Sequence, residues 1–143
     1  MKRIFVVSPL RGTPMQFKMI DDRARMLENT GAADEIVRKA VAAWRAELFE
    51  SNQRLAERLC REVILAGNRP VAGHLFYPHF LDDKVQSERE LGMKAGREDL
   101  IECQEAWIYT VYGISSGMEL DVTAARDHSI LLHTPDHWAA SER

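Results

Sequence analysis

The chain has 143 residues, of which 45% are hydrophobic and 29% are charged, and this suits one compact domain over residues 1–143. Its formal net charge of −3 excludes the basic surface that a long nucleic acid requires, although one or two arginines suffice for a small nucleotide. No apolar run is long enough for a signal peptide or a membrane helix, so we expect a cytoplasmic protein without a membrane partner.

Apolar spacing predicts alternating strands and helices along the chain. Residues 2–7 are rich in β-branched and aromatic residues and predict the first strand. Apolar residues at helical spacing before Gly67 predict a helix that ends at this glycine. The helix after that begins with a capping-box pattern from Ser87 to Glu90. Such alternation favours an α/β fold whose mostly parallel sheet is covered on both faces. The other expected strands are residues 70–76, 106–112 and 129–133, and the expected helices are residues 32–66, 87–103 and 118–127.

A helical insertion at residues 13–50 interrupts this alternation after the first strand. It is far longer than an ordinary loop between a strand and a helix, it includes a polar stretch at residues 21–30, and no glycine or proline breaks residues 32–66. One interpretation is a long helix that packs on its own core. The other is a lid or a dimer arm, which would close over a site or pack against a partner chain through Phe17, Met19, Met26, Leu27 and Trp44.

Two turns rich in small residues each follow an apolar strand and predict a ligand site. Because the carboxyl ends of parallel strands lie at one edge of a sheet, we expect the two turns to face each other across a crevice. The second turn opens a helix with Glu119 and Asp121 in its expected first turn, where free N–H groups and the helix dipole stabilise anions. The turn residues are Ser8, Arg11 and Gly12 in the first case and Ser115, Ser116, Gly117 and Met118 in the second.

The histidines and cysteines indicate neither a metal site nor a disulfide. No histidine spacing matches a closed zinc site, so we expect no metal and no cofactor, and His74 is kept as a candidate contact for phosphate or base. Cys60 and Cys103 occupy apolar positions of expected helices, which is typical of reduced core thiols.

Several short segments outside the insertion carry a resemblance to a known family. They include Ser-Pro-Leu-Arg-Gly at 8–12, His-Leu at 74–75, Tyr-Pro at 77–78, Phe-Leu-Asp-Asp at 80–83, Glu-Arg-Glu-Leu-Gly at 88–92 and Ile-Ser-Ser-Gly-Met at 114–118. They resemble the nucleoside 2-deoxyribosyltransferase-like superfamily, in particular a small phage and bacterial branch that is a domain of unknown function. The resemblance implies a flavodoxin-like, three-layer homodimer with about five strands in its sheet. It also implies cleavage or exchange of N-glycosidic bonds through a carboxylate nucleophile, with serines and N–H groups receiving a 5′-phosphate.

The same resemblance assigns the nucleophile to Asp121, where the family has glutamate, with Glu119 as the alternative. Two residues along a helix turn about 200° around its axis, so both carboxylates cannot point into one crevice. Both turns are also similar to those of the deoxynucleoside 5′-monophosphate N-glycosidases in the superfamily. Ser115 stands where the transferases have aspartate, and because a serine does not repel phosphate, this favours nucleotides over free nucleosides.

Two more positions depart from the family pattern. Gly96 stands where the family carries the aspartate that protonates the departing base, and Phe5 replaces a tyrosine. Asp82 and Asp83 are therefore candidate acids in the loop that contributes to base recognition, and Tyr77 is a candidate for stacking on the base.

Three functional interpretations are compatible with these residues. The first is hydrolysis of the N-glycosidic bond in a nucleoside or deoxynucleoside 5′-monophosphate. The second is non-catalytic binding of a nucleotide or nucleotide-derived signal on the same fold, which the departures from the family pattern favour. The third is a nucleoside 2-deoxyribosyltransferase, which differs from the hydrolase in excluding water.

Overall fold

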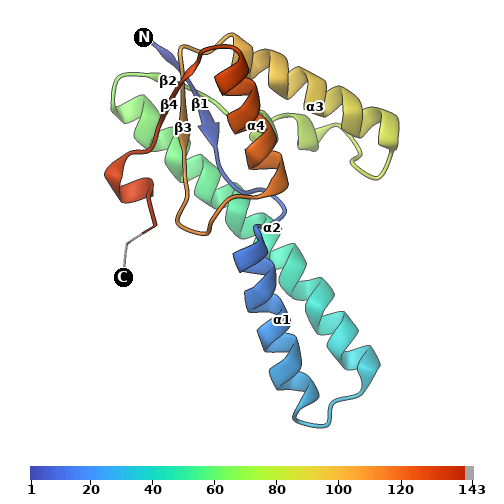
Figure 1. Ribbon diagram of the computed structural model, residues 1–143. Helices are drawn as coiled ribbons and strands as arrows, with labels where there is room; N and C mark the ends of the chain where they lie inside the picture. Colours follow the sequence, from blue (N-terminus) through green and yellow to red (C-terminus); the bar gives the residue numbers. More distant parts are fainter. Residues whose placement is uncertain (141–143) are drawn as a thin grey trace.

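The protein has an α/β fold built on a four-stranded sheet in which every strand is parallel to its neighbours (Figure 1). The structure is a computed structural model, and it describes residues 1–140. The sheet order is β2-β1-β3-β4, which agrees with the first four strands of the flavodoxin-like order. The strands are β1 (Arg3–Val7), β2 (Arg69–Val71), β3 (Glu105–Ile108) and β4 (Leu131–His133).

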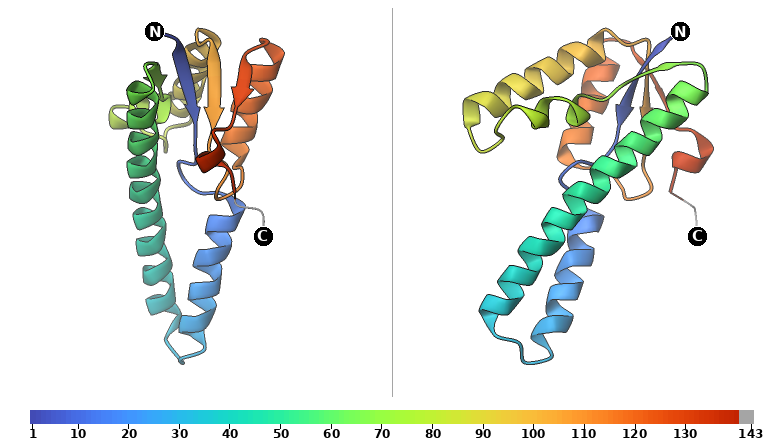
Figure 2. Two further views of the ribbon diagram at one scale, coloured as in Figure 1. Left: turned by 90° about the vertical axis from the view of Figure 1, so that its left-hand side faces the viewer. Right: turned by 180° about the vertical axis from the view of Figure 1, so that it is seen from behind.

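The central strand β1 is buried on both faces because it carries apolar residues at successive positions. Phe5 and Val7 pack toward one face, among residues of the long helix α3 (Gln86–Ile101) and the shorter α4 (Ser116–Asp127). Ile4 and Val6 point to the other face. That face is covered by the C-terminal half of α2 (Asp34–Leu65) and by a 3-10 turn, η3 (Asp136–Trp138). Helices therefore cover both faces of the sheet, as the sequence predicted (Figure 2).

The expected insertion is an antiparallel helical hairpin that projects away from the sheet (Figure 2). It consists of α1 (Pro14–Glu28) and the N-terminal half of α2, and the two helices pack against each other through buried residues such as Ile20 and Val37. Residues 21–28 of the polar stretch are thus helical. The interpretation as a helix packed on its own core accounts for this hairpin, and the dimer-arm interpretation stays a prediction.

A buried hydrogen-bond network joins the base of the hairpin to the loop after β1. Thr13 and Gln16 form a capping box at the start of α1. The amide of Gln16 donates to Asn52 Oδ1 at 2.9 Å, and Asn52 Nδ2 donates to the carbonyl oxygen of Leu10 at 3.1 Å. The conformation of the first turn therefore depends on side chains from both helices of the hairpin.

The sheet within residues 1–140 has four strands, so the prediction of about five is wrong, and two of the expected strands end well before their apolar runs do. The strand expected at 70–76 ends at Val71, and the chain forms 3-10 turns at η1 (Gly73–Leu75) and η2 (Tyr77–His79). The strand expected at 106–112 ends at Ile108, because Thr110 donates its N–H to the carbonyl of Trp138 instead of to a strand. After β4, Pro135 precedes η3, and a proline cannot donate a ladder hydrogen bond.

Two smaller expectations also need correction. The Ser87–Glu90 pattern makes no capping box, since α3 begins at Gln86 after Val85 and has no side-chain cap. Cys103 lies just beyond α3, although it is buried as expected, and both cysteines are free thiols. None of the helices within residues 1–140 combines the length and apolar character that a membrane crossing requires.

We expect Asn52→Ala to lower the free energy of unfolding by about 2 kcal/mol, because it leaves buried polar groups of Gln16 and Leu10 without partners. Urea denaturation followed by circular dichroism measures this change. Ser51→Ala, at an exposed position of the same helix, is the matched control and should stay within about 0.5 kcal/mol of the parent. An Asn52 variant as stable as the parent would show that the network does not hold the hairpin.

Candidate functional site

A cleft of about 330 Å³ lies where β1 and β3 end, between their following loops and the helices α3 and α4. The two turns predicted from the sequence do face this cleft, because the parallel strands that precede them end at the same edge of the sheet. The sequence-predicted residues that line it are Ser8, Arg11, Gly12, His74, Tyr77, Asp83, Ser115, Ser116, Gly117, Met118 and Asp121.

Ser8 and His74 form a neutral hydrogen-bonded pair at one side of the cleft. Ser8 Oγ lies 3.0 Å from His74 Nε2, and Ser8 is almost fully buried. Burial lowers the pKa of His74 to about 4, so the imidazole is uncharged at neutral pH. His74 lies in η1 rather than at the end of a strand, and its ring meets the first turn directly. Serine and histidine thus offer polar contacts without adding charge.

Arg11 is held at the edge of the cleft by two neighbours. Its guanidinium pairs with the carboxylate of Asp83, and it lies 5.5 Å from the centre of the Phe49 ring on α2. Gly12, next in the chain, has φ +147°, and a Cβ there would come within 2.8 Å of the Phe17 ring. Only glycine fits this bend of the first turn, so the position of Arg11 depends on Gly12 and on the hairpin.

The second turn places the N-terminus of α4 in the cleft. Ser115 is the N-cap, and its Oγ accepts a hydrogen bond from the N–H of Met118 at 3.2 Å. The first N–H groups of the helix, at Ser116 and Gly117, have no acceptor within the helix. Both residues are exposed toward the cleft, and this end of a helix attracts anions.

The structure distinguishes between the two acids of α4. Asp121 lines the cleft, whereas Glu119 is exposed and does not contribute to it. Because α4 begins at Ser116, Asp121 lies in the second turn of the helix, and the expectation of both acids in the first turn is wrong for Asp121. Burial raises the pKa of Asp121 to about 7, although the nearby Arg97 opposes this shift.

The helix α3 contributes residues that the sequence interpretation did not select. Arg89, Gly92, Met93, Gly96 and Arg97 line the cleft, and their spacing places them on one face of the helix. None of the ion pairs among residues 1–140 involves Arg89 or Arg97. The signal that could have identified this face is two glycines between two arginines at helical spacing.

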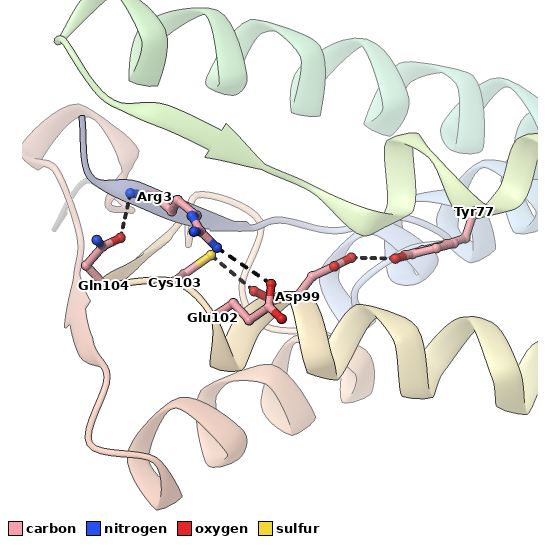
Figure 3. Close-up of polar contacts among 6 residues, drawn as sticks. All are labelled: Arg3, Tyr77, Asp99, Glu102, Cys103 and Gln104. Atoms are coloured by element: carbon pink, nitrogen blue, oxygen red, sulfur yellow. Dashed lines mark hydrogen bonds and ion pairs between the residues drawn. The ribbon is translucent and has the colours of Figure 1, made fainter.

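Tyr77 lines the cleft with its ring rather than with its hydroxyl group. The hydroxyl donates a 2.6 Å hydrogen bond to Asp99 on α3, as Figure 3 shows, and this bond raises the pKa of Tyr77 to about 12. The ring also lies close to Gly73. It is therefore a fixed apolar wall of the cleft.

Other sequence candidates lie outside the cleft. Asp82 is exposed, and its carboxylate accepts the N–H of Lys84 at 2.9 Å, so it stabilises a local turn. The proposed lid residues of the hairpin do not line the cleft, and the ring of Trp44 instead contacts Arg23. No group of three or more His, Cys, Asp or Glu side chains within residues 1–140 is placed to hold a metal ion.

Folding stability should depend on the protonation of Asp121. Because the folded protein raises its pKa from 3.8 to about 7, the contribution is fully present below pH 4 and is lost as pH rises through 7. Between pH 4 and pH 8 this group should remove up to ~4 kcal/mol of stability, and Asp121→Asn should abolish that part of the change, while the lowered pKa of His74 adds a rise in stability with pH up to about 6.5 in both proteins. Chemical denaturation across this pH range measures the effect. Glu119→Gln is the control, and if it flattened the profile as much as Asp121→Asn, the assignment to Asp121 would be wrong.

A family model described as a domain of unknown function, DUF7768, matches residues 41–134, more than half of the chain. The matched range includes the cleft residues of η1, η2, α3 and α4, and it leaves out β1, the first turn and α1. No curated protein and no solved structure matches the chain.

Proposed function

The chain belongs to the DUF7768 family, a domain of unknown function, and we propose that its cleft binds a nucleoside or deoxynucleoside 5′-monophosphate and hydrolyses its N-glycosidic bond. The observation that carries this proposal is that α4 supplies both a free N-terminus and the partly buried carboxylate of Asp121 to one cleft. Asp121 lies five positions after Ser116, or about 7.5 Å further along the helix axis, so the carboxylate is set apart from the N–H groups that begin α4.

Several features support phosphate binding at the α4 end of the cleft. The N–H groups at the start of α4 and the hydroxyls of Ser8 and Ser116 are neutral donors around one space. Arg89 and Arg97 add positive charge to the same cleft without an ion pair. A dianionic phosphate therefore meets donors and cations there, while Asp121 lies further along the helix.

The chemistry that we propose for Asp121 is that of a carboxylate beneath the sugar. As the C1′–N bond breaks, its electron pair leaves with the base, and the sugar carbon acquires positive charge that an ionised Asp121 stabilises or traps as an ester. Water then adds to C1′ and completes the hydrolysis. The base takes up a proton, for which Asp83 is the sequence-predicted acid that lines the cleft. This role requires the deprotonated form of Asp121.

Binding of a nucleotide or nucleotide-derived signal without turnover is the second candidate. The raised pKa of Asp121 is compatible with it, because a protonated carboxyl can donate a hydrogen bond to a bound ligand but cannot act as a nucleophile. Transferase activity is the third interpretation, and added acceptor base would reveal it by exchange. The nucleotide partner and the homodimer are proposals that rest on the family resemblance, and the cytoplasmic location is an expectation from the apolar pattern of the sequence.

Incubation with a panel of ribo- and deoxyribonucleoside 5′-monophosphates should release free base in proportion to time, measured by chromatography. Asp121→Asn should slow this release by about a hundredfold or more, because an amide cannot stabilise the cationic sugar as an anion does. Glu119→Gln should stay within about twofold, since Glu119 does not line the cleft. No release from any nucleotide, together with saturable thermal stabilisation by one of them, would contradict the hydrolase and support the binder.

The rate of base release should rise with pH through about 7, because only the ionised form of Asp121 is active in this mechanism. Initial rates from pH 5 to pH 9, at substrate concentrations that saturate the protein, give the profile. A rate that falls through the same range would instead assign to Asp121 the role of proton donor.

A further inference from the structure

The cleft face of α3 is unusually bare for the wall of a binding site. Between Arg89 and Arg97, two of the three lining residues are glycines, Gly92 and Gly96. Gly92 is covered, because a Cβ built on it would lie 3.1 Å from the side chain of Leu81. Gly96 is not covered, since a Cβ built there has no heavy atom within 4 Å.

Nothing in the packing of the protein requires a glycine at position 96. Its backbone is not in the left-handed region, and a side chain there would meet open space. A glycine inside a helix is less favourable than an alanine. Gly96 therefore destabilises α3, and no close packing around it explains why a glycine is present. Glycine is the residue that allows a ligand to approach the backbone closely. The open space beside Gly96 is therefore suited to hold part of a ligand.

The surroundings of this space suit a flat aromatic ring. Gly73 in η1 packs between the Tyr77 ring and α3, since a Cβ on Gly73 would lie 3.2 Å from the ring and 3.5 Å from the Cα atom of Gly96, and all three residues line the cleft. Arg97, the next residue along α3, interacts electrostatically with Asp121. The fixed Tyr77 ring, the open space beside Gly96 and the carboxylate of Asp121 thus belong to one cleft.

We propose that the exposed backbone at Gly96 is the seat of the nucleobase, and that the missing side chain at this position lets the cleft accept purine nucleotides. This inference rests on the proposed function. A purine bound with its sugar at Asp121 extends to α3 and lies against Gly96 and the Tyr77 wall. A pyrimidine is one ring shorter and leaves part of this space unfilled. Residue 96 thereby sets the size of base that the cleft takes.

Gly96→Ala tests whether residue 96 contacts the base or serves only the fold. The substitution should raise thermal stability and lower the affinity for purine nucleotides. The substitution should raise the thermal midpoint of the free protein, since alanine is the better helix former and meets no neighbour. It should weaken binding of dAMP and dGMP by about tenfold or more, and Gly96→Val should weaken it further. Binding of dCMP and of ribose 5-phosphate, which lacks a base, should stay within about twofold of the parent.

Isothermal titration calorimetry with each ligand, supported by thermal shift, measures these affinities on the full chain. Lys94→Ala is the matched control, because Lys94 lies on α3 but does not line the cleft. Purine binding that is unchanged in Gly96→Ala overturns the proposal, and so does an equal weakening for ribose 5-phosphate.

These measurements also distinguish this inference from the proposed function. If Gly96→Ala selectively loses purine binding and the parent releases no base, the base-binding role of Gly96 is supported and hydrolysis is refuted. Release of base with the same purine affinity in parent and variant would support the hydrolase and refute the seat. Failure of the parent to bind any of these ligands would refute both.

Discussion

The parallel pairing of β1 with β3 at the centre of the sheet is the constraint on which the site depends. The register pairs Val7 with Ile108, so both strands end at one edge and their following loops must meet there. Burial of β1 on both faces holds this pairing, because a shift of one residue would exchange the side chains of the two core layers. The cleft is therefore a consequence of the core, and its side chains come from loops and helix ends that the core positions.

Burial and charge act against each other in the cleft, and their balance determines its chemistry. The low polarity of the surroundings keeps His74 neutral and raises the pKa of Asp121 to about 7, while Arg97 opposes the second effect. A carboxyl with a pKa near 7 changes its charge when the pH varies around neutrality. The neutral Ser8–His74 pair and the N–H groups that begin α4 line the same cleft and add no negative charge to it.

The hairpin supports the cleft without entering it. Asn52 and Gln16 hold the carbonyl of Leu10, and Phe49 contacts Arg11, so the first turn is braced by residues of the insertion. Phe17 occupies the space that Gly12 leaves. An insertion of this kind can change the first turn, and with it the placement of Arg11, while the sheet stays as it is. The family match begins at residue 41 within α2, so it covers the last part of the hairpin and leaves out β1 as well as α1.

The sequence by itself determined the α/β class, the helical insertion and the two turns, because apolar periodicity and small residues after strands are local signals. The family spacing favoured Asp121 over Glu119, but the direction of each side chain depends on the rotation of α4 about its axis, which is set by what Met118 and Ala125 pack against. For the same reason the sequence did not predict that Arg89 and Arg97 line the cleft, because their face of α3 meets it only after Leu100 is buried in the core. The strand lengths, and the count of four rather than five, depend on hydrogen bonds between distant segments. Only tertiary packing decides such features, because a side chain's direction becomes defined when its element docks on the rest of the chain.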